Sequence, residues 1–206
     1  MSTTALCLTA LLLIIPIAIS IKEKLNIAKD LIIASIRAVI QLVILGYILH
    51  FIFDLNEPWI LILFVLVIVI NASWNTISRA SKVMHHVFWI SFVSIFIGTA
   101  LPLTVIVLVG AIDFTGNELI PIAGMLANNG LIAINLAYQN LDRAFVKEYS
   151  SIECKLALAA TPKLASKSAV RESIKLAIVP TIDSVKTYGL VSIPGMMTGM
   201  IISGVD

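Results

Sequence analysis

Polar side chains stand inside long apolar stretches of this sequence, and they are its best candidates for chemistry. Arg37 and Gln41 are four residues apart in one stretch, so on a helix they share a face. Asn128, Asn129 and Asn135 stand together in another stretch. Polar groups are costly inside a membrane and generally face protein or water. These five residues are therefore candidates for lining a path for a polar solute.

Each of these groups also has a structural interpretation. Arg37 would lie about 9 Å along a helix from Leu31, close enough to reach the lipid headgroups as an anchor. It would otherwise face inward and pair with a neighbouring helix. The asparagines either bridge helices that Gly124 and Gly130 allow to approach closely, or line a solvated path. The sequence leaves both choices open.

A third candidate group lies near the end of the sequence, where Pro194 and Gly195 precede Met196, Met197 and Met200. Proline and glycine can break a membrane helix and free carbonyl groups toward a cavity. Thioethers are soft ligands that suit Cu(I), but methionine also serves as adaptable packing. The metal ligands, if any, thus stay unknown.

No residue is predicted to be catalytic. The sequence has no His-Glu-x-x-His motif and no Ser/His/Asp arrangement at a plausible membrane depth. It also has no Gly-x-x-x-x-Gly-Lys-Ser/Thr motif, so we expect no ATPase site in this chain. The net charge of +2 is small and scattered, which gives no indication of a nucleic acid partner.

The elements that must position these residues are membrane-spanning helices. Of the 206 residues, 59% are hydrophobic and 13% are charged, against about 45–50% and about 25% in soluble domains. A membrane helix needs about 20 mostly apolar residues. Stretches that meet or nearly meet this requirement are 4–21, 31–53, 59–77, 87–112, 119–138 and 188–205. We predict an all-α, polytopic transmembrane helix bundle with six spans, forming a single membrane domain over residues 1–206.

The charges between the six stretches predict their orientation. Basic and non-basic loops alternate along the chain without exception, and lysine and arginine mark the cytoplasmic side. The N-terminus is therefore expected outside the cell (inner or plasma) membrane, with residues 142–186 forming a long cytoplasmic segment. A cleaved signal peptide is the competing interpretation of the first stretch, but no basic residue precedes it.

The long cytoplasmic segment carries helix signals. Ser150 and Glu153 have the spacing of a capping box, and Thr161 with Pro162 would end the helix that follows and start another. Farther on, apolar residues repeat at helical spacing, up to and beyond a kink or break at Pro180. These residues are Val170, Ile174, Ile178, Ile182 and Val185. The segment fits either a surface helix at the lipid headgroups or a short helix that docks a soluble partner.

Several motifs resemble the FetB-like permease family of ABC transporters, which includes bacterial iron-export permeases and plant aluminium-tolerance permeases. The most specific motif is Gly189–Gly199, with the sequence Gly-Leu-Val-Ser-Ile-Pro-Gly-Met-Met-Thr-Gly. Weaker matches are Ile120–Met125 with Asn129, Glu153–Pro162, and Arg37 with Gln41-Leu42 and Gly46-Tyr47. The resemblance extends from about residue 37 to residue 204, in the family's order.

This sequence also departs from the family pattern. Ala159 stands where the family usually has glycine, Asn128 replaces the glycine that usually precedes Asn129, and Met200 replaces a usual glutamine. The family continues past the last motif with at least one more span. The sequence does not tell whether its end at Asp206 is natural or a truncation.

The resemblance implies the permease subunit of an ABC transporter that exports iron or another metal ion. A separate ATPase chain would bind ATP and magnesium, this chain would hold no cofactor, and the permease would form a homodimer in the lipid bilayer. A coupling helix at residues 150–162 would contact the ATPase. Its contact residues would be Glu153, Ala157, Ala159, Ala160, Thr161 and Pro162. The alternatives are a secondary transporter driven by an ion gradient and a membrane scaffold that transports nothing.

Overall fold

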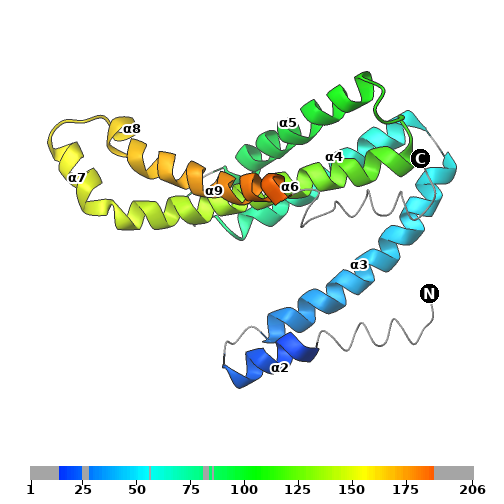
Figure 1. The fold of residues 1–206 in the computed structure, drawn as a ribbon, viewed down its shortest axis with the longest axis horizontal. Coiled ribbons are helices and arrows are strands. Elements are labelled where there is room, and N and C mark those ends of the chain that lie inside the picture. The colour runs from blue at the N-terminus through cyan, green and yellow to red at the C-terminus, as the bar shows by residue number, and fades with distance from the viewer. Residues whose placement is uncertain (1–13, 25–27, 56, 81–83, 85, 188–206) are drawn as a thin grey trace. The chain divides into compact units, whose positions relative to one another are not determined.

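The computed structural model describes residues 14–24, 28–55, 57–80, 84 and 86–187. They belong to two compact units, Met1–Leu55 and Asn56–Asp206. Within the described ranges the chain forms helices and no strand, which confirms the all-α fold class (Figure 1). The prediction of a single membrane domain stays a prediction.

The first unit contains α2 (Ile14–Lys22) and α3 (Ala28–Leu55), which contact each other. The stretch Ala28–Ile48 of α3 is long and apolar enough to cross a membrane. The Ser35 hydroxyl donates a hydrogen bond to the carbonyl oxygen of Leu31 at 2.8 Å. This polar side chain is therefore satisfied within its own helix, as a membrane requires.

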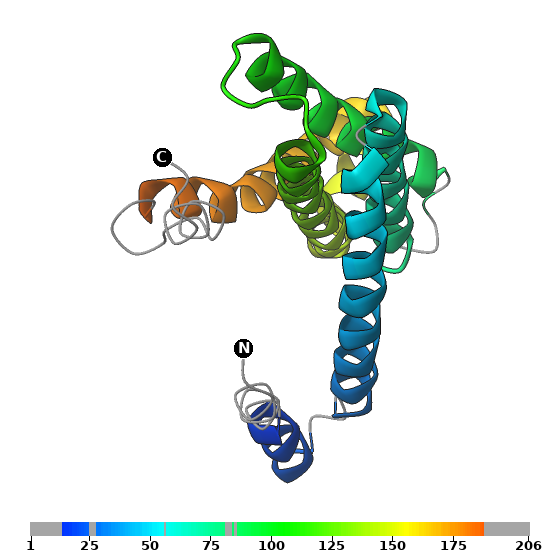
Figure 2. The same cartoon turned by 90° about the vertical axis from the view of Figure 1, so that its right-hand side faces the viewer.

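The second unit contains a bundle of three helices, α4 (Pro58–Ile77), α5 (Val87–Leu108) and α6 (Gly116–Lys147) (Figure 2). Each helix contacts the other two. The bundle has a buried cluster formed by Val69, Ala72, Ile95 and Ala127. The small side chains of Ala72 and Ala127 let the helices approach closely beside Val69 and Ile95.

Local signals explain where these helices begin and end. Pro58 opens α4 after an extended Glu57, the position in which a proline costs no hydrogen bond. α5 ends at Leu108, before the predicted end at residue 112, because the chain turns at Gly110. Gly110 has a φ of 72°, a left-handed conformation that glycine adopts without strain.

α3, α4, α5 and α6 are each long and apolar enough to cross a membrane, which confirms four of the predicted stretches as candidate spans. Residues 14–21 of the predicted stretch 4–21 belong to α2, and residues 4–13 lie outside the described part of the chain. The predicted stretch 188–205 lies outside the described residues. The total of six spans therefore stays a prediction.

α6 continues well beyond the bundle. At 32 residues it is about 48 Å long, whereas about 20 residues cross a bilayer. Tyr138 of α6 is hydrogen-bonded to Ser91, near the start of α5. The residues after Tyr138, among them the charged Asp142, Arg143 and Lys147, therefore extend past the adjacent end of α5.

The extension of α6 is one arm of a helical hairpin. Tyr149–Ala157 (α7) and Pro162–Ala165 (α8) form its tip, and Lys167–Thr187 (α9) runs back along α6 (Figure 1). α9 buries Ala169, Ser173 and Ala177, spaced four residues apart. These small side chains form the face that packs against α6.

One prediction for this region is wrong. The predicted capping box does not form, because Ser150 lies inside α7, which follows α6 after the single residue Glu148 and has no side-chain cap. Residues 150–162, predicted to contain the coupling helix, comprise most of α7, a turn and the first residue of α8, so the chain ends one helix and starts another at Pro162 as predicted. Of the kink or break predicted at Pro180, the break does not occur, because α9 continues through that residue.

Candidate functional site

The tip of the hairpin is built around a tight turn between α7 and α8. The amide of Ala160 donates to the carbonyl of Lys155, and the amide of Ala159 donates to that of Leu156, both at 3.0 Å. This pair of hydrogen bonds is the Schellman motif, which satisfies the last carbonyl groups of a helix. The turn between α7 and α8 is therefore fixed by its own backbone.

Ala159 occupies the left-handed position of this motif, with a φ of 62°. Glycine is the usual residue there because a Cβ atom strains that conformation, by about 1–2 kcal/mol. The family that this sequence resembles usually has glycine at the same position. Alanine in place of the usual glycine at position 159 therefore strains the backbone at the centre of the tip.

α8 begins as its sequence signals predict. Thr161 is the extended residue before the helix, Pro162 is the first helical residue, and the Thr161 carbonyl accepts from the amides of Leu164 and Ala165 at 2.9 Å. The Thr161 side chain makes no capping hydrogen bond. At the base of the tip, Ser168 Oγ donates to Glu148 Oε2 at 2.5 Å, which joins the two arms of the hairpin.

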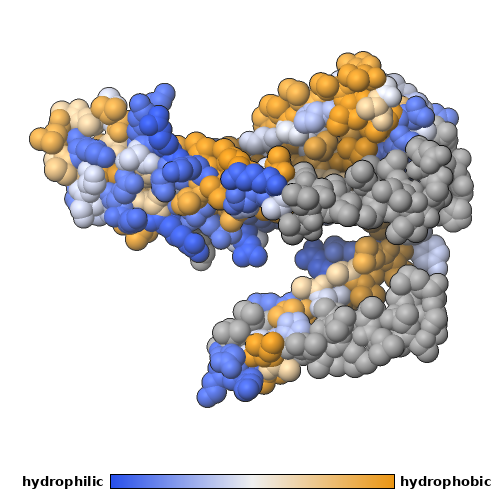
Figure 3. Space-filling view, viewed as in Figure 1, coloured by the Kyte–Doolittle hydropathy of each residue, from blue (hydrophilic) through white to orange (hydrophobic). Residues whose placement is uncertain are grey.

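The predicted coupling residues lie at this tip and are accessible. Glu153, Ala157, Ala159, Thr161 and Pro162 are exposed, and Ala160 is half-buried. Large apolar side chains are exposed among them: Leu156 at 43%, Leu158 at 79% and Leu164 at 60%. Figure 3 shows apolar (orange) side chains among polar (blue) ones at this end of the second unit. Exposed apolar groups in a polar setting are typical of a protein contact surface.

The predicted pathway residues of α3 lie on its surface. Arg37 and Gln41 are exposed, and with Ile33, Ile36 and Ile40 they line a shallow pocket of about 350 Å³. The two polar residues do share one helical face, as their spacing predicts. Their roles as headgroup anchor or pathway lining both remain predictions.

The asparagines of α6 have different environments. Asn128 and Asn129 are exposed, whereas Asn135 is half-buried and its Oδ1 atom is enclosed without a hydrogen-bond partner among the described residues. A Cβ atom placed on Gly130 would lie 3.6 Å from Ile95, so α5 and α6 are close at this level. An enclosed amide oxygen of this kind is a natural place for a water molecule or a polar solute.

The last group of predicted pathway residues is Pro194, Gly195, Met196, Met197 and Met200, and these residues lie outside the described part of the chain. In the part that the structure describes, no three His, Cys, Asp or Glu residues gather in a group suited to a metal ion.

A hydrogen-bonded chain of side chains joins all three helices of the bundle, and the sequence analysis did not identify it. Thr76 Oγ1 of α4 is hydrogen-bonded to Ser91 Oγ of α5 at 2.8 Å, and Ser91 Oγ is 3.0 Å from the hydroxyl oxygen of Tyr138 on α6. Thr76 and Ser91 are fully buried. The available signal was that all three hydroxyl residues stand at the predicted cytoplasmic ends of their stretches.

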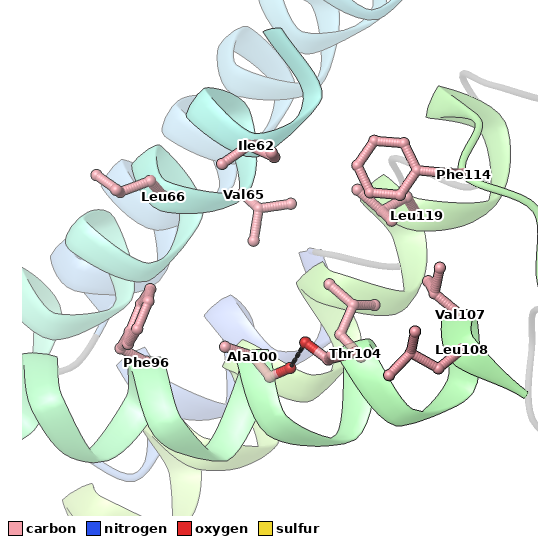
Figure 4. A pocket seen from close by; sticks show the side chains of 11 residues that line it. Ile62, Val65, Leu66, Phe96, Ala100, Thr104, Val107, Leu108, Phe114 and Leu119 are labelled. Atoms are coloured by element: carbon pink, nitrogen blue, oxygen red, sulfur yellow. Dashed lines mark hydrogen bonds between the residues drawn. The ribbon is translucent and has the colours of Figure 1, made fainter. Parts of the chain in front are cut away.

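A cavity near the other end of the bundle is apolar. It has a volume of about 370 Å³ and lies between α4, α5 and the start of α6 (Figure 4). Its lining residues include Ile62, Leu66, Phe96 and Leu119. The hydroxyl of Thr104 is satisfied by the carbonyl of Ala100 at 2.7 Å. The cavity suits an apolar group and offers no ligand for an ion.

A family model described as "Uncharacterised protein family (UPF0014)" matches residues 3–206. The chain is 45% identical over 202 residues to the "Probable iron export permease protein FetB" of Escherichia coli (strain K12), covering 98% of this chain and 78% of that protein. It is 34% identical over 206 residues to "UPF0014 membrane protein YjkA" of Bacillus subtilis (strain 168), covering 100% and 82%.

A plant protein is also similar to the chain. "Protein ALUMINUM SENSITIVE 3" of Arabidopsis thaliana is 31% identical over 192 residues, covering 93% of this chain and 70% of that protein. No solved structure matches the chain. The relatives therefore include a bacterial permease and a plant protein, in agreement with the resemblance found in the sequence motifs.

Proposed function

The chain belongs to the UPF0014 family of membrane proteins, and on that premise we propose that it is the permease subunit of an ABC transporter. A separate ATPase chain drives it, and its cargo is iron or another metal ion that leaves the cytoplasm. Two copies of the permease form the pathway in the cell membrane. ATP and magnesium bind to the ATPase, and this chain holds no cofactor.

The observation that carries this proposal is the exposed apolar tip. Leu158 and Leu164 stand on a turn that backbone hydrogen bonds hold in place, at the end of an extension that leaves the bundle. At 79% and 60% exposure, Leu158 and Leu164 bury little of their surface within the hairpin. A partner protein that covers the tip accounts for both the exposure and the fixed geometry.

The hairpin can carry motion from the partner to the bundle. α6 is continuous from Gly116 to Lys147, so a displacement of the tip also moves the helix that holds Asn128, Asn129 and Asn135. α9 packs along the extension and stiffens it. Closure of the ATPase on ATP binding would thereby change whether the asparagines are exposed to the cytoplasmic side or to the outer side of the membrane.

The cargo is inferred from a relative. The Escherichia coli protein is named a probable iron export permease, and its alignment covers nearly all of this chain. Arg37, Gln41, the three α6 asparagines and Pro194, Gly195, Met196, Met197 and Met200 are the proposed pathway residues. Asn135 Oδ1 has the environment expected of such a residue, because it is enclosed and has no described partner.

Reconstitution tests the proposal directly. The full chain and its candidate ATPase are placed in liposomes, and ATP hydrolysis and transport are measured with a panel of metal ions. Stimulation by one ion is expected. Leu158→Glu should lower this stimulation at least about tenfold, since a charge buried in an interface without a partner costs several kcal/mol. Thermal stability should not change, because Leu158 is exposed.

The control is Glu172→Gln, an exposed position on α9, outside the turn between α7 and α8. With this variant, the ATPase should hydrolyse ATP as fast as it does with the unmodified chain. If Leu158→Glu and Glu153→Ala both leave stimulation and transport intact, the proposed coupling role of the tip is wrong. Transport that survives ATP depletion would indicate a secondary transporter, and the absence of any transport would favour a scaffold.

The proposed orientation has its own test. Cys154 is an exposed, free cysteine on α7, and the loop charges predict that α7 lies in the cytoplasm. A membrane-impermeant maleimide should modify Cys154 in inside-out vesicles but not in intact cells, in a Cys7→Ser background. Equal modification from the outer side of intact cells would reverse the proposed orientation.

A further inference from the structure

α9 presents an apolar stripe that α6 does not cover. The small residues Ala169, Ser173 and Ala177 pack on α6. One residue after each of them stand Val170, Ile174 and Ile178, which are 38%, 51% and 46% exposed. Ile182 continues the same spacing at 46%. The repeat predicted from the sequence is thus real, but it is not the face that holds the hairpin together.

A row of basic residues runs beside this stripe. Lys163, Lys167, Arg171 and Lys175 follow one another at intervals of four residues, from α8 into α9. On α9 this spacing places Lys167, Arg171 and Lys175 along one side, and Lys163 precedes them on α8. All four side chains are exposed.

The basic row and the apolar stripe meet in a groove of about 320 Å³. Its lining comprises Lys163, Lys167 and Arg171 from the basic row, Val170 and Ile174 from the stripe, and Ser166. No acidic residue lines it. Asp183 of α9 is occupied elsewhere, in an ion pair with Lys186 at 3.3 Å. The groove therefore has a positive end and an apolar side.

The direction of α9 indicates which kind of molecule would fit this groove. The helix runs from the tip back toward α4 and α5, the helices long enough to cross a membrane (Figure 1). The groove lies in the half of α9 nearer the tip, and the apolar stripe continues from it along the next turns toward the bundle. A molecule with an anionic head and an apolar tail matches both the charge and the order of these features.

We propose that the groove at Lys163, Lys167 and Arg171 binds the phosphate headgroup of an anionic phospholipid, whose acyl chains lie along Val170, Ile174 and Ile178. A protein partner is the less favoured occupant, because the stripe leads away from the tip and toward the membrane. Such a lipid would hold α9 at the membrane surface while the tip remains free for another contact.

Native mass spectrometry of the detergent-purified full chain tests this proposal, with phosphatidylglycerol and phosphatidylcholine as probes. Phosphatidylglycerol is expected to bind more tightly. The double variant Lys167→Gln/Arg171→Gln should weaken its binding about 20- to 30-fold, the effect of removing two cations at an anionic surface. The matched control, Lys147→Gln/Lys155→Gln, removes the same charge from the hairpin outside the groove and should change binding less than about twofold.

A third variant examines the apolar side of the groove. Ile174→Gln should weaken phosphatidylglycerol binding severalfold and leave any binding of glycerol 1-phosphate, the headgroup without chains, unchanged. Equal affinity for the two phospholipids, equal loss in the control, or equally tight binding of glycerol 1-phosphate would each overturn the proposal. Loss of ATPase association in the double variant, with phosphatidylglycerol binding unchanged, would overturn it in favour of a protein contact.

Discussion

The two ends of α6 have opposite environments. Toward its start, α4 and α5 enclose Leu119, Ala123 and Ala127, each at most 2% exposed. Its other end leads into α7, in which no residue is buried. One continuous helix thus joins a packed bundle to a tip whose geometry rests on backbone hydrogen bonds.

The contacts that stabilise the bundle and the surface proposed to bind a partner therefore lie toward opposite ends of α6. Changes in the bundle should alter the stability of the protein, because they disturb contacts between three helices. Changes at the tip should alter association with a partner and leave stability nearly unchanged. The expected change in stability decreases from the core of the bundle, through its interhelical hydrogen bonds, to the tip.

Ile95→Ala should cause the largest loss. Ile95 is 1% exposed and contacts the buried cluster of the bundle, so truncation leaves a cavity and costs about 2 kcal/mol or more. Thermal unfolding in detergent measures this change. Gly130→Ala is the control at the same contact, because its new Cβ would sit at an ordinary 3.6 Å from Ile95. An unchanged unfolding temperature for Ile95→Ala would contradict the description of a packed core.

Thr76→Val should have an intermediate effect. It removes the hydrogen bond to Ser91 that connects α4 with α5, and such bonds in membrane proteins contribute about 0.6–1.7 kcal/mol. Its combination with Tyr138→Phe gives a double-mutant cycle across the three helices. A coupling energy near zero would mean that the three hydroxyl groups do not act as one chain.

Ala159→Gly should have the smallest effect, and it should be favourable. Glycine relieves the positive φ of this residue, and the gain is expected to be about 0.5–1 kcal/mol. Slower amide exchange at Ala160, whose amide closes the turn, is the measurement. Ala159→Val should have the opposite sign. Faster exchange in the glycine variant would show that the turn does not limit the stability of the tip.

The sequence predicts the candidate spans well because apolar length is a local property. α3, α4, α5 and α6 each contain one stretch long and apolar enough to cross a membrane, and Pro162 after Thr161 marks the start of α8. These features depend on a few neighbouring residues. They need no knowledge of what packs against them.

The other features of the fold depend on contacts between residues that are far apart in the sequence. Asp142, Arg143 and Lys147 suggested a loop, yet α6 continues through them because the hairpin with α9 stabilises a helix outside the bundle. The apolar repeat of α9 predicted a helix but not what packs against it, and α6 packs on the smaller Ala169, Ser173 and Ala177. The Thr76–Ser91–Tyr138 chain likewise joins residues that only the fold brings together.

The most direct test of the central claim uses Cys154 of α7, which is exposed and free. In a Cys7→Ser background, the rate of maleimide modification is measured with and without the candidate ATPase. The account predicts that the ATPase slows modification of Cys154 at least about tenfold, whereas a cysteine introduced as Glu172→Cys, with Cys154→Ser, reacts at an unchanged rate. An equal rate at Cys154 in a complex that still transports would contradict docking at the tip.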